Sequence, residues 1–237
     1  MDEWVRPISN TRRFNASGVN SFLLGVMFDR SIPADRAWES GEWINESLGD
    51  HQDVTVLWNK LVSMEKKRLT GFLKYGYGGM AFHRHYKTFA KQLPRAAKVI
   101  LDKYDGDPRN IWNTERDVDV IRNRLEEIPG IGSALSRMTV LILARNYGLI
   151  GGKASLPQLD IKPDIHVMRV FRRSGLIDSK AIEKDAIETA RQLNPQFPAV
   201  LDAPCFEIGQ KWCRPSSKKC EDCPITEACP KLRIVDT

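Results

Sequence analysis

Apolar residues recur at spacings of three and four along most of the 237-residue chain, which is the period of one face of an α-helix. No stretch shows the alternating pattern of a half-buried strand. Short breaks rich in Gly, Pro, Asp and Asn separate the periodic segments. The pattern predicts an all-α protein of roughly eight to ten helices. The periodic segments are residues 19–27, 51–73, 85–104, 117–128, 132–148, 165–176 and 180–193.

The placement of charge narrows the choice of partner. The formal net charge is +6, and the segment from Lys60 to Lys98 contains ten Lys or Arg residues but only one acidic residue, Glu65. Such a run suits a polyanion, although a solvated helix face explains the charge equally well. No apolar run approaches the roughly 20 residues that cross a bilayer, and the first residues lack an apolar signal core. We therefore expect a cytoplasmic protein, nucleoid-associated in a prokaryote, with no membrane partner.

The stretch LEEIPGIGSALSRM, residues 125–138, predicts a tight hairpin between two helices. Pro129 ends the first helix, because it disfavours helical geometry before it and offers no amide hydrogen. The glycines permit backbone conformations that other residues avoid, and they let a ligand approach the backbone closely. The amides in the first turn of the next helix can then hold a phosphate. A simple helix–helix connection explains the turn equally well. The candidate phosphate contacts in the hairpin are Gly130, Ile131, Gly132 and Ser133.

Four cysteines, Cys213, Cys220, Cys223 and Cys229, lie near the C-terminus, separated by six, two and five residues. Four thiolates in one short loop can converge on one metal centre, and both a [4Fe-4S] cluster and zinc accept such a set. Typical zinc sites contain two close cysteine pairs, but this loop contains one. An iron-sulfur cluster is therefore favoured over zinc, and a disulfide is least favoured. Cys205 is expected to be a small buried hydrophobic residue.

LEEIPGIGSAL resembles the Leu-Pro-Gly-x-Gly hairpin of the helix-hairpin-helix DNA glycosylases, the group that includes endonuclease III. The six, two, five cysteine spacing is similar to the cluster loop of its endonuclease III-like members. The resemblance implies a two-lobed all-α fold with a [4Fe-4S] cluster. Residues 21–155 would form the helical lobe with the hairpin, and residues 1–20 would join 156–237 in the cluster lobe. DNA would lie across both lobes, with the damaged nucleotide flipped out.

The segment PDIHVMRV resembles the stretch that carries the catalytic aspartate of this superfamily, which corresponds here to Asp164. Cleavage of an N-glycosidic bond builds positive charge on the sugar, and a carboxylate can stabilise that charge and position water. Asp164 could also simply cap the helix that begins at Ile165. Asp160 is a weaker candidate, and His166 is expected to be structural.

Bifunctional relatives place a nucleophilic lysine two residues after the second hairpin glycine. The matching residue here is Ala134, so the resemblance implies a monofunctional enzyme that uses water. Lys153 and Lys162 lie in the long connection between hairpin and Asp164. Either lysine could fold back to replace the missing amine, which would instead make the protein a glycosylase with AP lyase activity.

Two further segments are candidates for contact with a distorted duplex. Where the superfamily commonly has a glutamine that fills the gap left by the flipped base, this chain has Arg30 and Ser31. Arg30 could equally pair with Asp29 or Asp35. The loop KYGYGGMAFHRHYK resembles the segment that inserts an apolar wedge, with Met80 as first candidate and Phe82 next, against core packing as the alternative. The expected phosphate contacts beside the wedge are His83, Arg84, His85 and Lys87.

Together these features predict a monomeric DNA glycosylase that acts on double-stranded DNA. It would flip a damaged or modified base, hydrolyse its N-glycosidic bond and leave the strand intact. The alternatives are a glycosylase with lyase activity, a non-catalytic protein that binds damaged DNA, and a zinc-stabilised nucleic-acid module.

Overall fold

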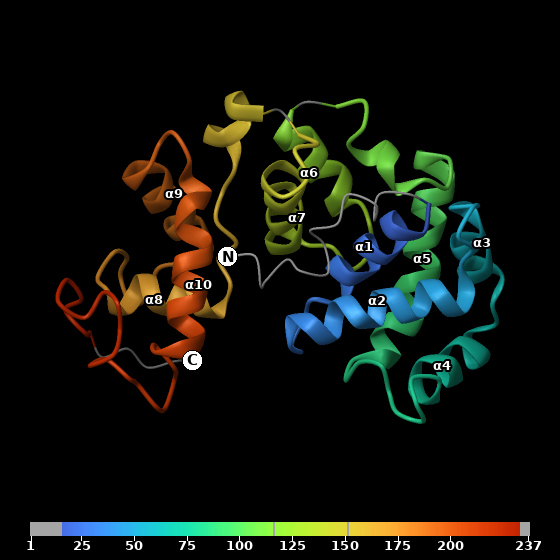
Figure 1. The fold of residues 1–237 in the computed structure, drawn as a ribbon, viewed down its shortest axis with the longest axis horizontal. Coiled ribbons are helices and arrows are strands. Elements are labelled where there is room, and N and C mark those ends of the chain that lie inside the picture. The colour runs from blue at the N-terminus through green and yellow to red at the C-terminus, as the bar shows by residue number, and fades with distance from the viewer. Residues whose placement is uncertain (1–15, 116, 151, 233–237) are drawn as a thin grey trace. The chain divides into compact units, whose positions relative to one another are not determined.

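The computed structural model describes residues 16–115, 117–150 and 152–232, and all their regular structure is helical (Figure 1). Within these residues no strand forms, and Tyr77 and Met80 share one isolated bridge. The predicted all-α fold class is confirmed, and the described residues form ten α-helices, within the predicted range. The chain divides after Ile150 into two compact units. The same described ranges contain no helix long and apolar enough to cross a membrane.

The first unit contains α1 (Ala16–Phe28), α2 (Ala34–Leu48), α3 (Thr55–Ser63), α4 (Lys66–Tyr75), α5 (Tyr86–Tyr104), η3 (Pro108–Ile111), α6 (Val118–Glu126) and α7 (Ser133–Arg145). The second unit contains η4 (Gly152–Gln158), α8 (Ile165–Arg173), α9 (Glu183–Leu193), η5 (Pro198–Leu201) and α10 (Asp202–Lys211). In the first unit α1 packs against α2, α5 packs against both α3 and α4, and α6 packs against α7. In the second unit α8 packs against α10.

Helix α1 is the central helix of the first unit. The side chains from Leu23 to Phe28 are buried, as expected for a helix that is apolar on all sides. Its contact with α2 depends on two glycines. A Cβ at Gly25 would lie 2.0 Å from the Trp38 ring, and a Cβ at Gly41 would lie 2.6 Å from the Ser21 carbonyl. The absence of these two side chains lets the helices approach closely.

Helix α2 was not among the segments predicted from apolar periodicity. Small and polar residues make up much of its buried face, including Ser40, Gly41 and Asn45. They interrupt the apolar residues of the same face, which include Trp38 and Ile44, so the apolar periodicity of this segment is weak. The pattern over 51–73 also covers two helices, since Met64 is extended and separates α3 from α4.

The second unit has its own apolar core, formed mainly by α8, α9 and α10. Helices α8 and α10 meet at Gly209, where a Cβ would lie 2.7 Å from the Cβ of His166. The His166 ring packs edge-on against Phe206, with centroids 5.0 Å apart. The close contact of these helices holds the residues after Asp164 against the helix that leads into the cysteine loop.

Candidate functional site

The hairpin lies between α6 and α7, as the sequence predicts. Gly130 has a φ of +111°, a conformation that favours glycine. The Ile131 side chain is buried and belongs to the core, and its amide donates to the Ile128 carbonyl at 2.9 Å. Gly132 and Ser133 are exposed. The backbone of the hairpin is therefore accessible at Gly132 and Ser133, next to the buried Ile131 side chain.

Helix α7 begins without a side-chain cap. The Ser136 amide donates to the Gly132 carbonyl at 2.9 Å, which is the first intrahelical bond. The amides of Ser133, Ala134 and Leu135 precede that bond, so they have no acceptor within the helix. Together with the partial positive charge of a helix N-terminus, they form a suitable contact for an anion.

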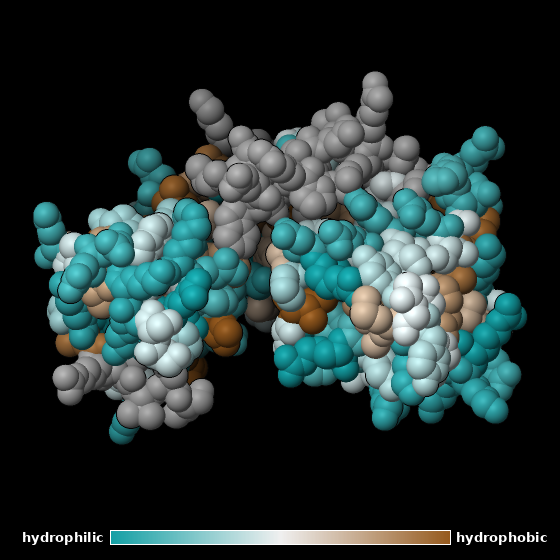
Figure 2. All heavy atoms as spheres, turned by 60° about the horizontal axis from the view of Figure 1, so that its bottom comes forward, coloured by the Kyte–Doolittle hydropathy of each residue, from teal (hydrophilic) through white to brown (hydrophobic). Residues whose placement is uncertain are grey.

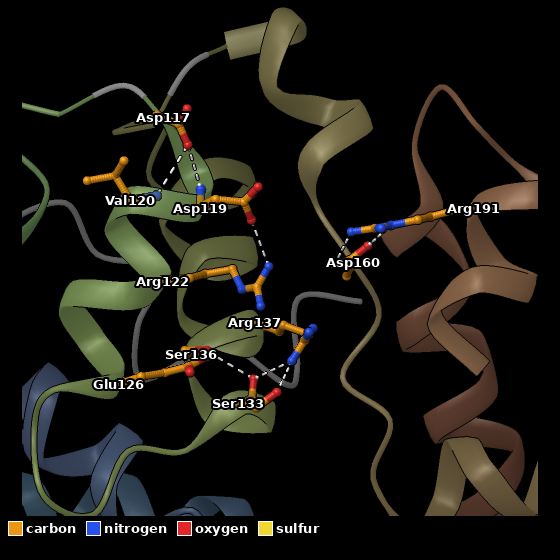
Figure 3. Close-up of polar contacts among 10 residues, drawn as sticks. All are labelled: Asp117, Asp119, Val120, Arg122, Glu126, Ser133, Ser136, Arg137, Asp160 and Arg191. Atoms are coloured by element: carbon orange, nitrogen blue, oxygen red, sulfur yellow. Dashed lines mark hydrogen bonds and ion pairs between the residues drawn. The ribbon is translucent and has the colours of Figure 1, made fainter. Parts of the chain in front are cut away.

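Polar side chains join the two helices of the hairpin (Figure 3). The Ser136 hydroxyl lies 2.6 Å from a Glu126 carboxylate oxygen, which links the start of α7 to the end of α6. The Arg137 guanidinium donates to both the hydroxyl and the carbonyl of Ser133. Arg137 lies three residues after Ala134 and therefore shares its helix face. Reasoning from the sequence missed Arg137, although this spacing could have revealed it.

The turn after α1 places Arg30 and Ser31 at the surface. Ser31 adopts a left-handed conformation with a φ of 60°, which is uncommon for a residue with a side chain. Among the described residues Arg30 forms no ion pair with Asp29 or Asp35, the alternative that the sequence had left open. The guanidinium is therefore available for an external partner.

Met80 is at the end of a tight turn between α4 and α5. Gly78 and Gly79 have positive φ values, and the Met80 amide donates to the Tyr77 carbonyl at 3.0 Å. The Met80 side chain is 59% exposed. Phe82, the second wedge candidate, is buried, and its ring lies 4.9 Å from that of Phe28. Of the two candidates, the structure leaves only Met80 accessible.

The phosphate contacts expected after the wedge fall into two groups. Arg84 and Lys87 are exposed, and His85 is partly exposed immediately before α5. His83 differs from the expectation, since it is 2% exposed and both of its ring nitrogens have backbone partners. Burial lowers the pKa of His83 to about 4, so its imidazole is neutral at pH 7. Its side chain thus belongs to the interior and not to a phosphate-binding surface.

Burial of His83 predicts a pH-dependent stability. Its folded pKa lies below the unfolded value of 6.5, so the stabilising contribution is complete above pH 6.5 and is lost as the pH falls toward 4. We expect the free energy of unfolding to fall by up to about 3 kcal/mol more in the wild type than in His83→Phe across this window. Urea unfolding followed by tryptophan fluorescence at several pH values measures the difference. Parallel curves for both proteins would contradict the prediction.

Asp164 is the N-cap of α8, as one reading of the sequence proposed. Its Oδ1 accepts from the amides of His166 at 2.8 Å and Val167 at 3.0 Å. The residue is only half-buried, and Oδ2 has no hydrogen-bond partner among the described residues. One carboxylate oxygen is thus held by the helix, while the other can act on a ligand. Capping and catalysis are therefore compatible at this residue.

The neighbouring candidates have other positions. Asp160 is buried and forms a two-point ion pair with Arg191, at 2.8 and 2.9 Å (Figure 3). That pairing gives Asp160 a structural role. The Lys162 amide donates to the Asp202 carboxylate, which fixes the backbone before Asp164. Lys153 falls within η4, and its side chain lies outside the described part of the chain.

All four cysteines of the loop line one pocket in the second unit, together with apolar side chains such as Val170, Ile208, Trp212 and Ile225. Within the residues that the structure describes, no group of three or more His, Cys, Asp or Glu side chains is arranged to hold a single metal ion. Sulfur ligands that surround an apolar pocket suit a larger group with four points of attachment. The donor set therefore fits an iron-sulfur cluster.

Two buried arginines of α8 support the cysteine loop. Arg169 donates to the carbonyls of Gly209 and Cys213 at 3.3 and 3.2 Å. Arg173 donates to the Arg214 carbonyl at 2.8 Å and lies 3.6 Å from Cys213 Sγ. These contacts connect the helix that follows Asp164 to the first residues of the loop. Cys205 is buried apart from the pocket, and burial raises the pKa of its thiol to about 12, as expected for a core residue.

The fold and the hairpin agree with the resemblance to the helix-hairpin-helix DNA glycosylases that the sequence shows, and comparison with known proteins supports the likeness. Among known proteins, the chain is 24% identical over 149 residues to endonuclease III of Bacillus subtilis (strain 168). That match covers 61% of this chain, and the chain spans 56% of the length of that curated relative. No protein-family model matches the chain.

Two solved structures extend the likeness at the level of the fold. A trapped endonuclease III–DNA covalent intermediate aligns with a TM-score of 0.63 and 19% identity, covering 90% of this chain and 84% of that one. A thermostable thymine-DNA glycosylase aligns with a TM-score of 0.60 and 16% identity, covering 96% of this chain and 94% of that one. Both similarities run through the two units described above.

Proposed function

We propose that this protein is a DNA glycosylase that removes an altered base from double-stranded DNA and leaves an abasic site. The observation that carries the proposal is the state of Asp164, whose carboxylate is fixed through Oδ1 and open at Oδ2. A negative charge held in this way stabilises the cation that develops on the sugar as the base departs. The same carboxylate can position or deprotonate the attacking water.

The hairpin and the exposed basic side chains would bind the DNA. Backbone amides at Gly132 and Ser133 would hold one phosphate without needing a charged side chain. Arg84 and Lys87 are exposed beside the Met80 turn and would contact further phosphates. Met80 would enter the base stack, and Arg30 would fill the gap left by the flipped nucleotide. The similarity in fold to an endonuclease III–DNA complex supports this arrangement.

We infer that the enzyme uses water and not an amine as its nucleophile. Ala134 occupies the position at which bifunctional relatives place their lysine. Arg137 brings a positive charge to the same helix face, but a guanidinium stays protonated and does not form a Schiff base. Lys153 and Lys162 remain the alternative sources of an amine, and either would make the enzyme a glycosylase with lyase activity.

The choice of nucleophile predicts a gain of function. In Ala134→Lys, an amine at the start of α7 can attack the sugar, so borohydride should trap a covalent protein–DNA complex on a duplex with a natural abasic site. Gel electrophoresis measures the trapped fraction, which we expect to rise at least about tenfold over the wild type. Ala134→Arg is the control, because it adds the charge without the nucleophile. Efficient trapping by the wild type itself would favour Lys162 or Lys153.

We further propose that Cys213, Cys220, Cys223 and Cys229 hold a [4Fe-4S] cluster. When bound, the cluster would link segments of the loop that have no helical structure of their own, as structural metal centres do. Arg173 would orient Cys213 through its contacts with the loop carbonyls and Sγ. Lys231 donates its amide to Cys229 Sγ at 3.4 Å, which suits a thiolate ligand. These contacts are made by the protein alone, and they would hold Cys213 and Cys229 in position to bind the cluster.

A further inference from the structure

A buried histidine joins two surface segments that lie far apart in the sequence. His83, in the loop before α5, has one ring nitrogen 3.0 Å from the Arg30 carbonyl, in the turn after α1. Its other ring nitrogen, Nδ1, accepts from the His85 amide at 2.9 Å. Because Nδ1 is the acceptor, Nε2 carries the hydrogen and donates to Arg30. One neutral imidazole thus fixes the turn and the loop together.

Aromatic packing reinforces this link. The Phe28 ring lies 4.9 Å from Phe82 and 5.0 Å from Phe89, and the His83 ring lies 4.8 Å from Phe89. Edge-to-face contacts of this kind are directional as well as apolar. We call His83 and these three phenylalanines the aromatic clamp. All four side chains are buried.

Helix α2 adds a second connection to the same loop. The Phe82 carbonyl accepts from Arg36 Nε at 3.3 Å and from the Ser40 hydroxyl at 3.4 Å. Adjacent residues of the loop, Phe82 and His83, are therefore tied to both helices that flank the Arg30 turn. A small rotation of the loop would have to move the turn as well.

In both segments the backbone is held by hydrogen bonds, whereas the side chains at the surface are exposed. Met80 is 59% exposed, and Arg30 and Ser31 are exposed on the neighbouring turn. On the face drawn in Figure 2, hydrophilic residues cover much of the visible surface, with smaller apolar areas between them. An exposed methionine and an exposed arginine held by one buried clamp can enter the same ligand at the same time.

We propose that His83 is a positioning residue that couples the Arg30 turn to the Met80 turn, so that both side chains enter a DNA duplex as one rigid unit. The inference rests on the proposed function, because it concerns how the duplex is opened. Separate insertion of two flexible side chains would cost the ordering entropy twice. Because the His83 ring fixes the backbone of both turns before DNA binds, only the two side chains remain to be ordered on binding.

A double-mutant cycle on the 237-residue chain tests the coupling. The probe is a duplex with one tetrahydrofuran abasic analogue opposite 2-aminopurine, so the unidentified target base is not needed. Titration by 2-aminopurine fluorescence gives the affinity for this duplex, and an unmodified duplex gives the background affinity. Arg30→Ala and Met80→Ala, alone and combined, should be coupled by at least about threefold in the wild-type background, which is within the range for interacting sites.

Two substitutions at His83 separate positioning from folding. His83→Asn keeps an acceptor for the His85 amide but does not reach Arg30, so the Arg30–Met80 coupling should vanish. His83→Gln keeps a donor near the position of Nε2, so most of the coupling should remain. Thr139→Val is the control, because it removes a buried hydrogen bond to Leu135 in the same unit and should leave the coupling unchanged. Circular dichroism confirms folding of each variant.

The outcomes distinguish failure of the coupling through His83 from failure of the proposed DNA glycosylase function. Failure of the wild type to prefer the tetrahydrofuran duplex over the unmodified one would overturn the proposed function. A clear preference with additive Arg30→Ala and Met80→Ala effects would overturn only the coupling by His83. Equal loss of coupling in His83→Asn, His83→Gln and Thr139→Val would assign the effect to general loosening of the unit and would also overturn it.

Discussion

Replacement of Asp164 by Asn is expected to slow base excision by at least about a hundredfold. The Asn side-chain oxygen can still accept from the amides of His166 and Val167, so the cap of α8 and the fold are retained. The negative charge that stabilises the sugar cation is lost. Single-turnover assays on duplexes with single lesions, scored as alkali-labile sites, measure the rate. Affinity for unmodified duplex should stay within about twofold, because Asp164 contributes no cation to phosphate binding.

Asp117 provides a matched control for this experiment. It caps α6 in the same way, with its Oδ1 accepting from Asp119 and Val120 at 2.8 and 3.2 Å (Figure 3). Asp117→Asn should therefore produce a similar small change in stability and no change in excision. Wild-type excision by Asp164→Asn would mean that the aspartate is only a cap. The non-catalytic DNA-binding alternative would then be favoured.

Loss of one loop cysteine should have the largest effect on stability. Cys223→Ser is expected to abolish absorbance near about 400 nm, the region of thiolate-ligated iron-sulfur centres. The residues from 213 to 232 contain no helix and are held by a few apolar side chains and by hydrogen bonds from Arg173, so a bound cluster would add much of their stability. A loss of about 3 kcal/mol would lower the melting temperature of a unit of this size by about 12 °C or more.

Cys205→Ala controls for loss of a thiol as such. Cys205 lies in the core of the second unit outside the cysteine pocket, so its replacement should preserve the absorbance and the iron content. Elemental analysis of the purified wild type distinguishes the two candidate centres. Stoichiometric zinc without iron would contradict the cluster and favour the zinc-stabilised alternative.

Local features of the sequence predicted the helices and the hairpin well, because their causes are local. Pro129 ends a helix by its own covalent geometry, and Gly130 adopts the positive φ that such a turn requires. The cysteine spacing likewise predicted a shared pocket, since residues 213–229 are too close in sequence to scatter widely. Helix α2 was missed because glycine and small polar residues form much of its buried face.

Within the candidate site, the sequence by itself determined which chemical groups are present. It contains a carboxylate at a helix start, alanine in place of a lysine, and four cysteines in one loop. Tertiary structure decided which of the candidates are accessible. Phe82 and His83 are buried while Met80, in the same loop, is exposed, because the aromatic rings of α1 and α5 cover one side of that loop. Burial depends on partners from distant segments, so no local pattern could assign these roles.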